Sequence, residues 1–207
     1  MPVSLPLFPL GTVLFPNGLL PLRVFEVRYL DMIGKCHKAG TPFGVVSLTH
    51  GSELRRPDET AEFHGVGTIA SIDSLETVQP GLLLVRCSGG QRFRIEQSEQ
   101  LQHGLWTARV QPLDDDHAVA VPPDLRNTSD ALARVIDTLR QREEAQQLLP
   151  LDQPLRLDDC GWVSNRWCEL LPLPMATKQR LMALDNPLVR LELVSDFLSR
   201  NGISTPG

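Results

Sequence analysis

Lysine is scarce in this sequence, and the chain carries no excess of positive charge. Only three of its 20 basic residues are lysines, and 25 acidic residues leave a formal net charge of −5 and a pI of about 5.5. A broad nucleic-acid-binding surface usually presents a basic stripe. The composition therefore argues against nucleic acid as the main partner, although it does not exclude a local basic patch.

Long apolar runs and targeting signals are also missing. No apolar run reaches the roughly 18 residues that a membrane-spanning helix needs. The N-terminus lacks the basic stretch of a secretory signal and is interrupted by Pro2 and Pro6. We therefore expect a cytoplasmic protein with no membrane segment.

The cysteine spacing excludes the common zinc-site patterns. Zinc sites usually draw on close C-x-x-C pairs, and this chain has none. We predict four reduced and mostly buried thiols, and we expect no metal and no other cofactor. The four are Cys36, Cys87, Cys160 and Cys168.

Catalytic motifs are absent as well. The chain has no G-x-x-x-x-G-K-[ST], no H-E-x-x-H and no G-x-S-x-G, and no G-x-G-x-x-G opens a helix after a strand. We expect a protein that is not an enzyme. A hydrolase whose nucleophile and base come from distant residues stays open as an alternative, because such sets need not be local.

The residues that are present predict a β-rich first half, which we assign to a domain over 1–113. Five prolines within 1–25 favour short edge strands over helix or central strands. Apolar residues at helical spacing predict a helix over about 26–37. Period-two patterning over 43–112 predicts several strands, and Gly89-Gly90 reads as the turn of a hairpin.

The second half predicts helices. An acidic and proline-containing stretch over 114–124 reads as an exposed linker. Beyond it we assign a helical bundle to 125–200 and a disordered tail to 201–207. Asp124 or Ser129 would cap the first helix of the bundle, and Asn186-Pro187 would open the last. The helices between them are predicted over about 162–171 and 175–184.

One segment, residues 5–30, reads LPLFPLGTVLFPNGLLPLRVFEVRYL and carries a family resemblance. It resembles the opening of the Lon protease substrate-binding domain, in which a proline-bounded strand leads to a PLR-x-FE-x-RY segment and a helix. Further matching positions extend the resemblance over nearly the whole chain. They are 43–46, 67–70, 90–95, 170–172 and 178–179.

The resemblance implies an α+β fold, with an N-terminal PUA-like β-barrel that includes one helix and a C-terminal α-helical bundle. The ATPase and peptidase modules of full-length Lon proteases have no counterpart in this sequence, so the chain is similar to the family's stand-alone members. The family implies a non-catalytic, proteolysis-associated module that binds unfolded polypeptides or protein partners. The alternative is an RNA-binding PUA-like protein.

The candidate binding residues fall at the predicted barrel–helix junction and in the bundle. They are Arg23, Phe25, Glu26, Arg28, Tyr29, Trp162 and Trp167. These residues also have a structural alternative: Glu26 would pair with Arg23 or another arginine, and at least one of the tryptophans would pack into the bundle. A groove between barrel and bundle, or addition of a strand to a sheet edge, would receive a peptide. RNA would instead use Arg55-Arg56, Arg92 and Arg94.

Overall fold

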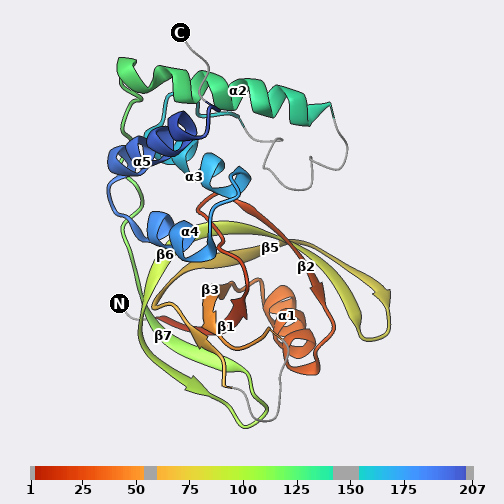
Figure 1. Ribbon diagram of the computed structural model, residues 1–207. Helices are drawn as coiled ribbons and strands as arrows, with labels where there is room; N and C mark the ends of the chain where they lie inside the picture. The colour runs from red at the N-terminus through yellow and green to blue at the C-terminus, as the bar shows by residue number, and fades with distance from the viewer. Residues whose placement is uncertain (1–2, 54–59, 142–153, 204–207) are drawn as a thin grey trace. The chain divides into compact units, whose positions relative to one another are not determined.

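The chain divides into two compact units, Met1–Asp115 and Asp116–Gly207. The computed structural model describes residues 3–53, 60–141 and 154–203. Strands dominate the first unit and helices make up the second, so the fold has the α+β class that was predicted (Figure 1). Among the described residues, no helix is both long enough and apolar enough to cross a membrane.

The described residues of the first unit form one helix and a sheet of seven strands. The strand order is β1-β7-β6-β5-β3-β4, and β2 pairs with β6 beside this path. β1 also pairs with β3, so the pairings among β1, β7, β6, β5 and β3 form a closed cycle. The elements are β1 Val3–Leu10, β2 Leu19–Val24, α1 Val27–Ala39, β3 Phe43–His50, β4 Glu62–Phe63, β5 Val66–Gln79, β6 Leu82–Gln100 and β7 Trp106–Pro112.

β1 is not the edge strand that its prolines predicted. Its residues 3–7 pair antiparallel with β7, and its residues 7–10 pair parallel with β3. A proline nitrogen has no hydrogen to donate to a neighbouring strand. Pro6 and Pro9 are tolerated because each half of β1 pairs with one neighbour, so a proline nitrogen can face the opposite side. The change of partner along the strand is a tertiary feature that composition does not encode.

The expected hairpin turn at Gly89-Gly90 is also wrong. Both glycines lie inside β6, which continues without a break, and the chain reverses instead at Gly81, whose φ is 83°. The N–H of Gly89 donates to the carbonyl of Gly18 at 2.8 Å, and its own carbonyl accepts from the N–H of Asn17 at 2.7 Å. Gly89 is therefore a site of close backbone approach rather than a turn.

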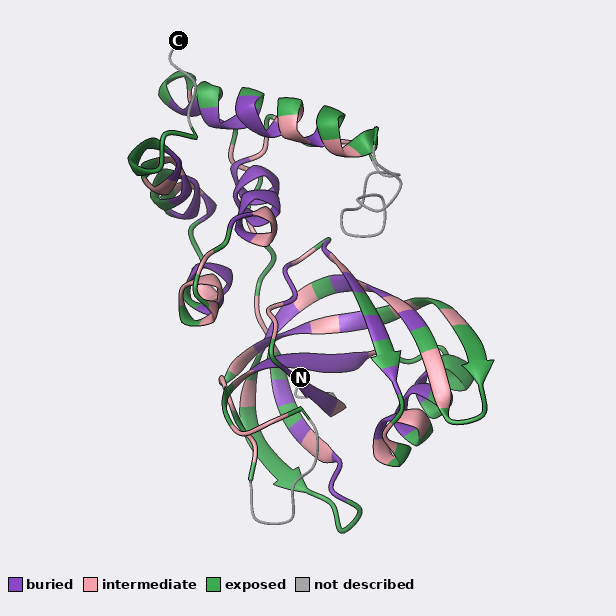
Figure 2. Ribbon diagram, turned by 45° about the vertical axis from the view of Figure 1, so that its right-hand side comes forward, coloured by how far each residue is buried: buried purple, intermediate pink, exposed green. Residues whose placement is uncertain are grey.

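Helix α1 covers part of the core of the first unit. It begins at Val27 and ends at Ala39, close to the predicted 26–37, and Gly40 terminates it in the left-handed conformation with φ 62°. Its buried residues pack in one cluster with apolar side chains of the strands, and Figure 2 shows the buried faces in purple. The buried residues of α1 are Tyr29, Met32, Ile33 and Cys36.

The second unit is built from helices whose boundaries follow local signals. Asn186 caps the last helix by accepting from the N–H groups of Leu188 and Val189, as predicted. The expected cap of α2 by Asp124 or Ser129 is wrong. No side chain of the described residues caps α2, and the Ser129 hydroxyl donates to the carbonyl of Leu157. The elements are η1 Pro123–Leu125, α2 Arg126–Arg140, α3 Cys160–Leu170, α4 Met175–Ala183 and α5 Pro187–Arg200.

A buried arginine ties several segments of the second unit together. The side chain of Arg190 on α5 is 1% exposed, and its guanidinium forms a two-pronged ion pair with Asp116 at 2.6 and 3.1 Å. It also donates to the side-chain oxygen of Asn165 and to the carbonyls of Leu181 and Leu184. A buried charge needs such partners because leaving it unpaired in the interior is costly.

All four cysteines are free and buried, as predicted. Burial raises the pKa of the Cys87 and Cys168 thiols to about 12, and it also raises the pKa of Cys36 and Cys160. Since the thiolate is the reactive form, all four should resist a disulfide reagent at pH 8 in the native protein. All four should react at once in denaturant. A native thiol that reacted at the denatured rate would contradict this packing.

Candidate functional site

A row of exposed side chains runs along β2 into the start of α1. Residues alternate between exposed and buried from position 21 onward, so Pro21, Arg23, Phe25 and Val27 are exposed while Leu22 and Val24 between the first three are buried. We call the four exposed residues the outer row. Phe25 is 55% exposed and Val27 is 81% exposed. Such exposure is unusual for two large apolar side chains only two residues apart.

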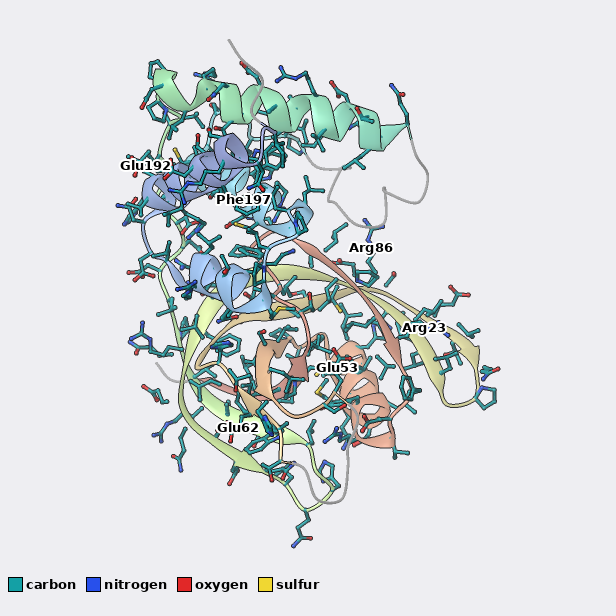
Figure 3. The ribbon with its side chains drawn as sticks, in the orientation of Figure 1. Arg23, Glu53, Glu62, Arg86, Glu192 and Phe197 are labelled. Carbon is teal, nitrogen blue, oxygen red and sulfur yellow. The ribbon has the colours of Figure 1, made fainter. Side chains whose placement is uncertain are left out.

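The neighbouring strands extend this surface. Arg23 on β2 is opposite Leu84 on β6, and Leu84 is in turn opposite Glu76 on β5. Directly opposite residues lie on the same face of a sheet, so these three side chains form a row across it. Leu84 is 38% exposed, and Val78 near the end of β5 is 50% exposed. Figure 3 labels Arg23 on β2 and Arg86 on β6.

The charged residues that flank Val27, Glu26 and Arg28, contact each other and nearby loops. Glu26 pairs with Arg28 at 2.9 Å, so the arginine partner is Arg28 and not Arg23. Arg28 also donates to the carbonyl of Gly104 at 2.8 Å and to that of Glu53 at 3.2 Å. One guanidinium thereby connects the start of α1 to two loops. Its geometry supports the structural interpretation of Glu26 and Arg28.

Tyr29 belongs to the core. It is 4% exposed, and its ring stacks on Phe8 with the centroids 4.0 Å apart. Burial raises the pKa of its phenol to about 12, which keeps the group neutral at physiological pH. The Arg28 guanidinium lies over the ring, 4.5 Å from its centroid. A bound partner would not reach this ring directly.

The two candidate tryptophans are buried in the second unit. Trp162 is 6% exposed and Trp167 is 2% exposed, and the indole N–H of Trp167 donates to the carbonyl of Thr128 at 3.0 Å. Every residue of α3 from Cys160 to Cys168 is buried. The packing interpretation of both tryptophans agrees with this burial, and an exposed aromatic surface does not.

Of the arginines considered for RNA contacts, Arg92 and Arg94 lie within the described residues. Arg92 is 3% exposed and donates to the carbonyl of Asp114 at 3.4 Å. Arg94 is exposed. Arg55 and Arg56 lie outside the described residues. Within the described ranges, no cluster of three or more His, Cys, Asp or Glu residues has the arrangement of a metal site.

Comparison with known proteins identifies the family. The family model for the ATP-dependent protease La (LON) substrate-binding domain matches residues 4–200. The chain belongs to this family. The Lon N-terminal domain protein from Xanthomonas campestris has a crystal structure with a TM-score of 0.75 and 30% identity, over 94% of this chain and 98% of that one.

Three further relatives of this Lon-family domain are two Lon proteases and the N-terminal domain of another. The N-terminal domain of the Mycobacterium avium complex Lon protease shares the fold, with a TM-score of 0.63 and 16% identity over 95% of this chain and 98% of that one. Lon protease 2 of Herpetosiphon aurantiacus is 25% identical over 96% of this chain, and the Lon protease of Flavobacterium johnsoniae is 32% identical over 47%. The matched regions span 24% and 12% of these two proteases.

Sequence reasoning missed part of the candidate surface. Val27, Leu84 and Val78 were not selected, because an apolar residue in a patterned segment is normally assigned to the core. The signal available for Val27 was the alternation that continues from Pro21 through Arg23 and Phe25. Nothing local marks Leu84 or Val78, because their exposure depends on the register of β5 and β6.

Proposed function

We propose that this Lon-family domain binds unfolded segments of protein substrates through the outer row and Leu84. The observation that carries the proposal is the exposure of Phe25 and Val27, at 55% and 81%, next to a sheet face that also exposes Leu84. Unfolded chains differ from folded proteins in offering apolar side chains to solvent. An exposed apolar surface can bury such side chains without a change in its own fold.

The size of the surface predicts modest affinity. Burying one large apolar side chain contributes roughly 1.5–3 kcal/mol, and association costs offset much of the sum. Arg23, which is exposed and has no ion pair among the described residues, can contact an acidic residue or a carbonyl of the bound segment. Affinity in the micromolar range, with little sequence preference, suits a receptor of many unfolded substrates.

Side-chain contact is favoured over strand addition as the binding mode. β2 pairs with β6 on one side, and no described strand pairs with its other side. Pro21 sits within β2 and has no N–H to offer an added strand. The edge therefore presents an interrupted ladder, while the outer row presents exposed apolar side chains at Phe25 and Val27.

The remaining parts of the proposal follow from the family and the strand pairing. The cyclic pairing through β1, β7, β6, β5 and β3 supports the PUA-like barrel that the resemblance implies. The domain contributes recognition of the substrate and takes no part in peptide cleavage. The comparisons support this division because the matching family model is that of the substrate-binding domain.

A double substitution, Phe25→Ser with Val27→Ser, tests the surface. Both side chains are exposed, so the variant should fold normally. Its affinity for reduced and carboxymethylated α-lactalbumin should fall about tenfold or more, because the two main apolar contacts are removed. Fluorescence anisotropy with the labelled unfolded protein, without ATP, measures the effect.

The matched control is Val189→Ser, which removes an apolar side chain 38% exposed on α5. It should bind like the unsubstituted protein. Equal affinity of the double variant and the control would refute the role of the outer row. A folded, disulfide-intact α-lactalbumin should not bind, and a salt-dependent complex with single-stranded RNA in its place would instead support the RNA-binding alternative.

A further inference from the structure

An apolar groove lies between α4 and α5 in the second unit. Its volume is about 460 Å3. The floor and walls include Leu181 and Leu184 from the α4 side and Leu193 and Phe197 from α5. Leu193 is 47% exposed, and Figure 3 labels Phe197. No part of the proposed function uses this groove.

Both walls of the groove repeat at helical spacing. Thr177, Leu181 and Leu184 line it at steps of four and three residues, and Leu193, Phe197 and Arg200 line it at the same steps. The α5 wall therefore follows its helix for about two turns, or about 10 Å. The α4 wall follows its helix for one turn, from Thr177 to Leu181, and Leu184 continues it just beyond the end of the helix at Ala183. Rows at this spacing form the ridges between which the side chains of a third helix pack.

The chemistry of the walls favours a helix over an extended chain. An extended segment would bring unpaired backbone N–H and C=O groups against the leucine and phenylalanine side chains. Burying such groups without partners is costly. A helix satisfies its own backbone groups and presents only side chains to the groove.

The rim of the groove carries a local excess of positive charge in an acidic chain. Arg180 is exposed and forms no ion pair among the described residues. Arg200 is 3.9 Å from Asp196, and both side chains are more than two-thirds exposed, at 81% and 70%. An exposed pair at that distance stabilises little and can exchange partners. Acidic residues on an incoming segment would therefore find two available arginines.

We propose that the α4–α5 groove binds an amphipathic helix of a protein partner, with leucine-type residues facing the groove and acidic residues flanking them. Leu193 and Phe197 contact the apolar stripe of the helix, and Arg180 and Arg200 pair with its carboxylates. The groove is a second site, and its ligand is a segment that folds into a helix when it binds. The outer row, by contrast, binds unfolded segments.

The test uses the full chain and two labelled peptides about four helical turns long. One carries leucines at i, i+3, i+4 and i+7 with flanking glutamates, and the other has lysines in place of the glutamates. Anisotropy should show tighter binding of the glutamate peptide. Leu193→Ser should weaken it about tenfold, since a central apolar contact is lost.

Charge reversal separates a specific rim contact from general stickiness. Arg180→Glu should weaken the glutamate peptide about fivefold and strengthen the lysine peptide. Val189→Ser, on α5 but outside the groove lining, should leave both affinities unchanged. A glutamate peptide with a central proline, which cannot form a continuous helix, should bind at least about tenfold more weakly.

Several outcomes would overturn the proposal. Equal affinity of the glutamate and lysine peptides would do so. So would a proline peptide that binds as tightly as the glutamate peptide, or a Leu193→Ser variant that binds the glutamate peptide as tightly as the unsubstituted protein. Light scattering that showed a dimer converted to a monomer by Leu193→Ser would assign the groove to a second copy of the chain. None of these results bears on the outer row, because its probe and its variants are different.

Discussion

Replacing Asp116 with alanine should lower the free energy of unfolding of the second unit by about 3–5 kcal/mol. The substitution leaves the Arg190 guanidinium, 1% exposed, without the carboxylate that it contacts at 2.6 and 3.1 Å. The amide oxygen of Asn165 and two backbone carbonyls remain, but they carry no compensating charge. Urea unfolding followed by helical circular dichroism measures the loss.

Asp115→Ala is the matched control for that measurement. Asp115 is the adjacent residue of the same type and is exposed, so its removal should change stability by less than about 0.5 kcal/mol. Adding Arg190→Met to Asp116→Ala should cost less than the sum of the single substitutions, because the stranded charge is removed. An Asp116→Ala protein as stable as the Asp115→Ala protein would show that the pair is not structural.

The second large effect is expected at Gly89 in β6. A side chain there would clash with the carbonyl oxygen of Phe15 and meet the Leu14 side chain at 3.1 Å. Relief requires the 15–18 turn to move away from the strand, which breaks the hydrogen bonds between Gly89 and the Asn17 and Gly18 backbone. Gly89→Ala should therefore destabilise the first unit by about 1–3 kcal/mol.

Gly90→Ala provides an adjacent control with the opposite expectation. The nearest atom to a Cβ at position 90 is the Ile69 carbonyl oxygen at 3.5 Å, an ordinary contact. Alanine loses less backbone entropy on folding, so Gly90→Ala should be neutral or stabilising by up to about 1 kcal/mol. Amide hydrogen exchange at Asn17 should accelerate only in Gly89→Ala. Equal stability of the two variants would contradict the close-approach role.

The parts of the fold that sequence reasoning predicted well depend on local chemistry. The helices expected over 162–171 and 175–184 are found at Cys160–Leu170 and Met175–Ala183. The predicted cap at Asn186 is present. Caps, prolines and helical spacing act within one or two turns, so the sequence shows them directly.

The parts that failed depend on contacts between distant segments. Gly89 was assigned to a turn. A glycine is needed there because a segment more than seventy residues earlier in the chain approaches its backbone closely. Asp116 and Arg190 are 74 residues apart, and nothing in the acidic triplet distinguished Asp116 from its neighbours. Steric and electrostatic pairings of this kind are set by tertiary packing, which a single sequence does not display.

The sequence predicted the region of the candidate site, and the structure separates its residues into an exposed group and a group that makes internal contacts. Arg23 and Phe25 lie on the exposed face, whereas Glu26, Arg28 and Tyr29 hold the chain where β2 enters α1. The segment that carries the family resemblance contains both kinds of residue at adjacent positions. Which of these residues are exposed depends on the strand register, because the register decides which side chains face the core.

Amide chemical-shift mapping of the full chain during titration with reduced and carboxymethylated α-lactalbumin tests the proposed binding surface most directly. We predict shifts concentrated at Arg23, Phe25 and Val27, and at Leu84 on the adjoining strand, at micromolar to high-micromolar ligand. The same titration should leave the amides of the α4–α5 groove unchanged. Shifts confined to other surfaces, or no shifts at saturating ligand, would contradict substrate binding at the outer row.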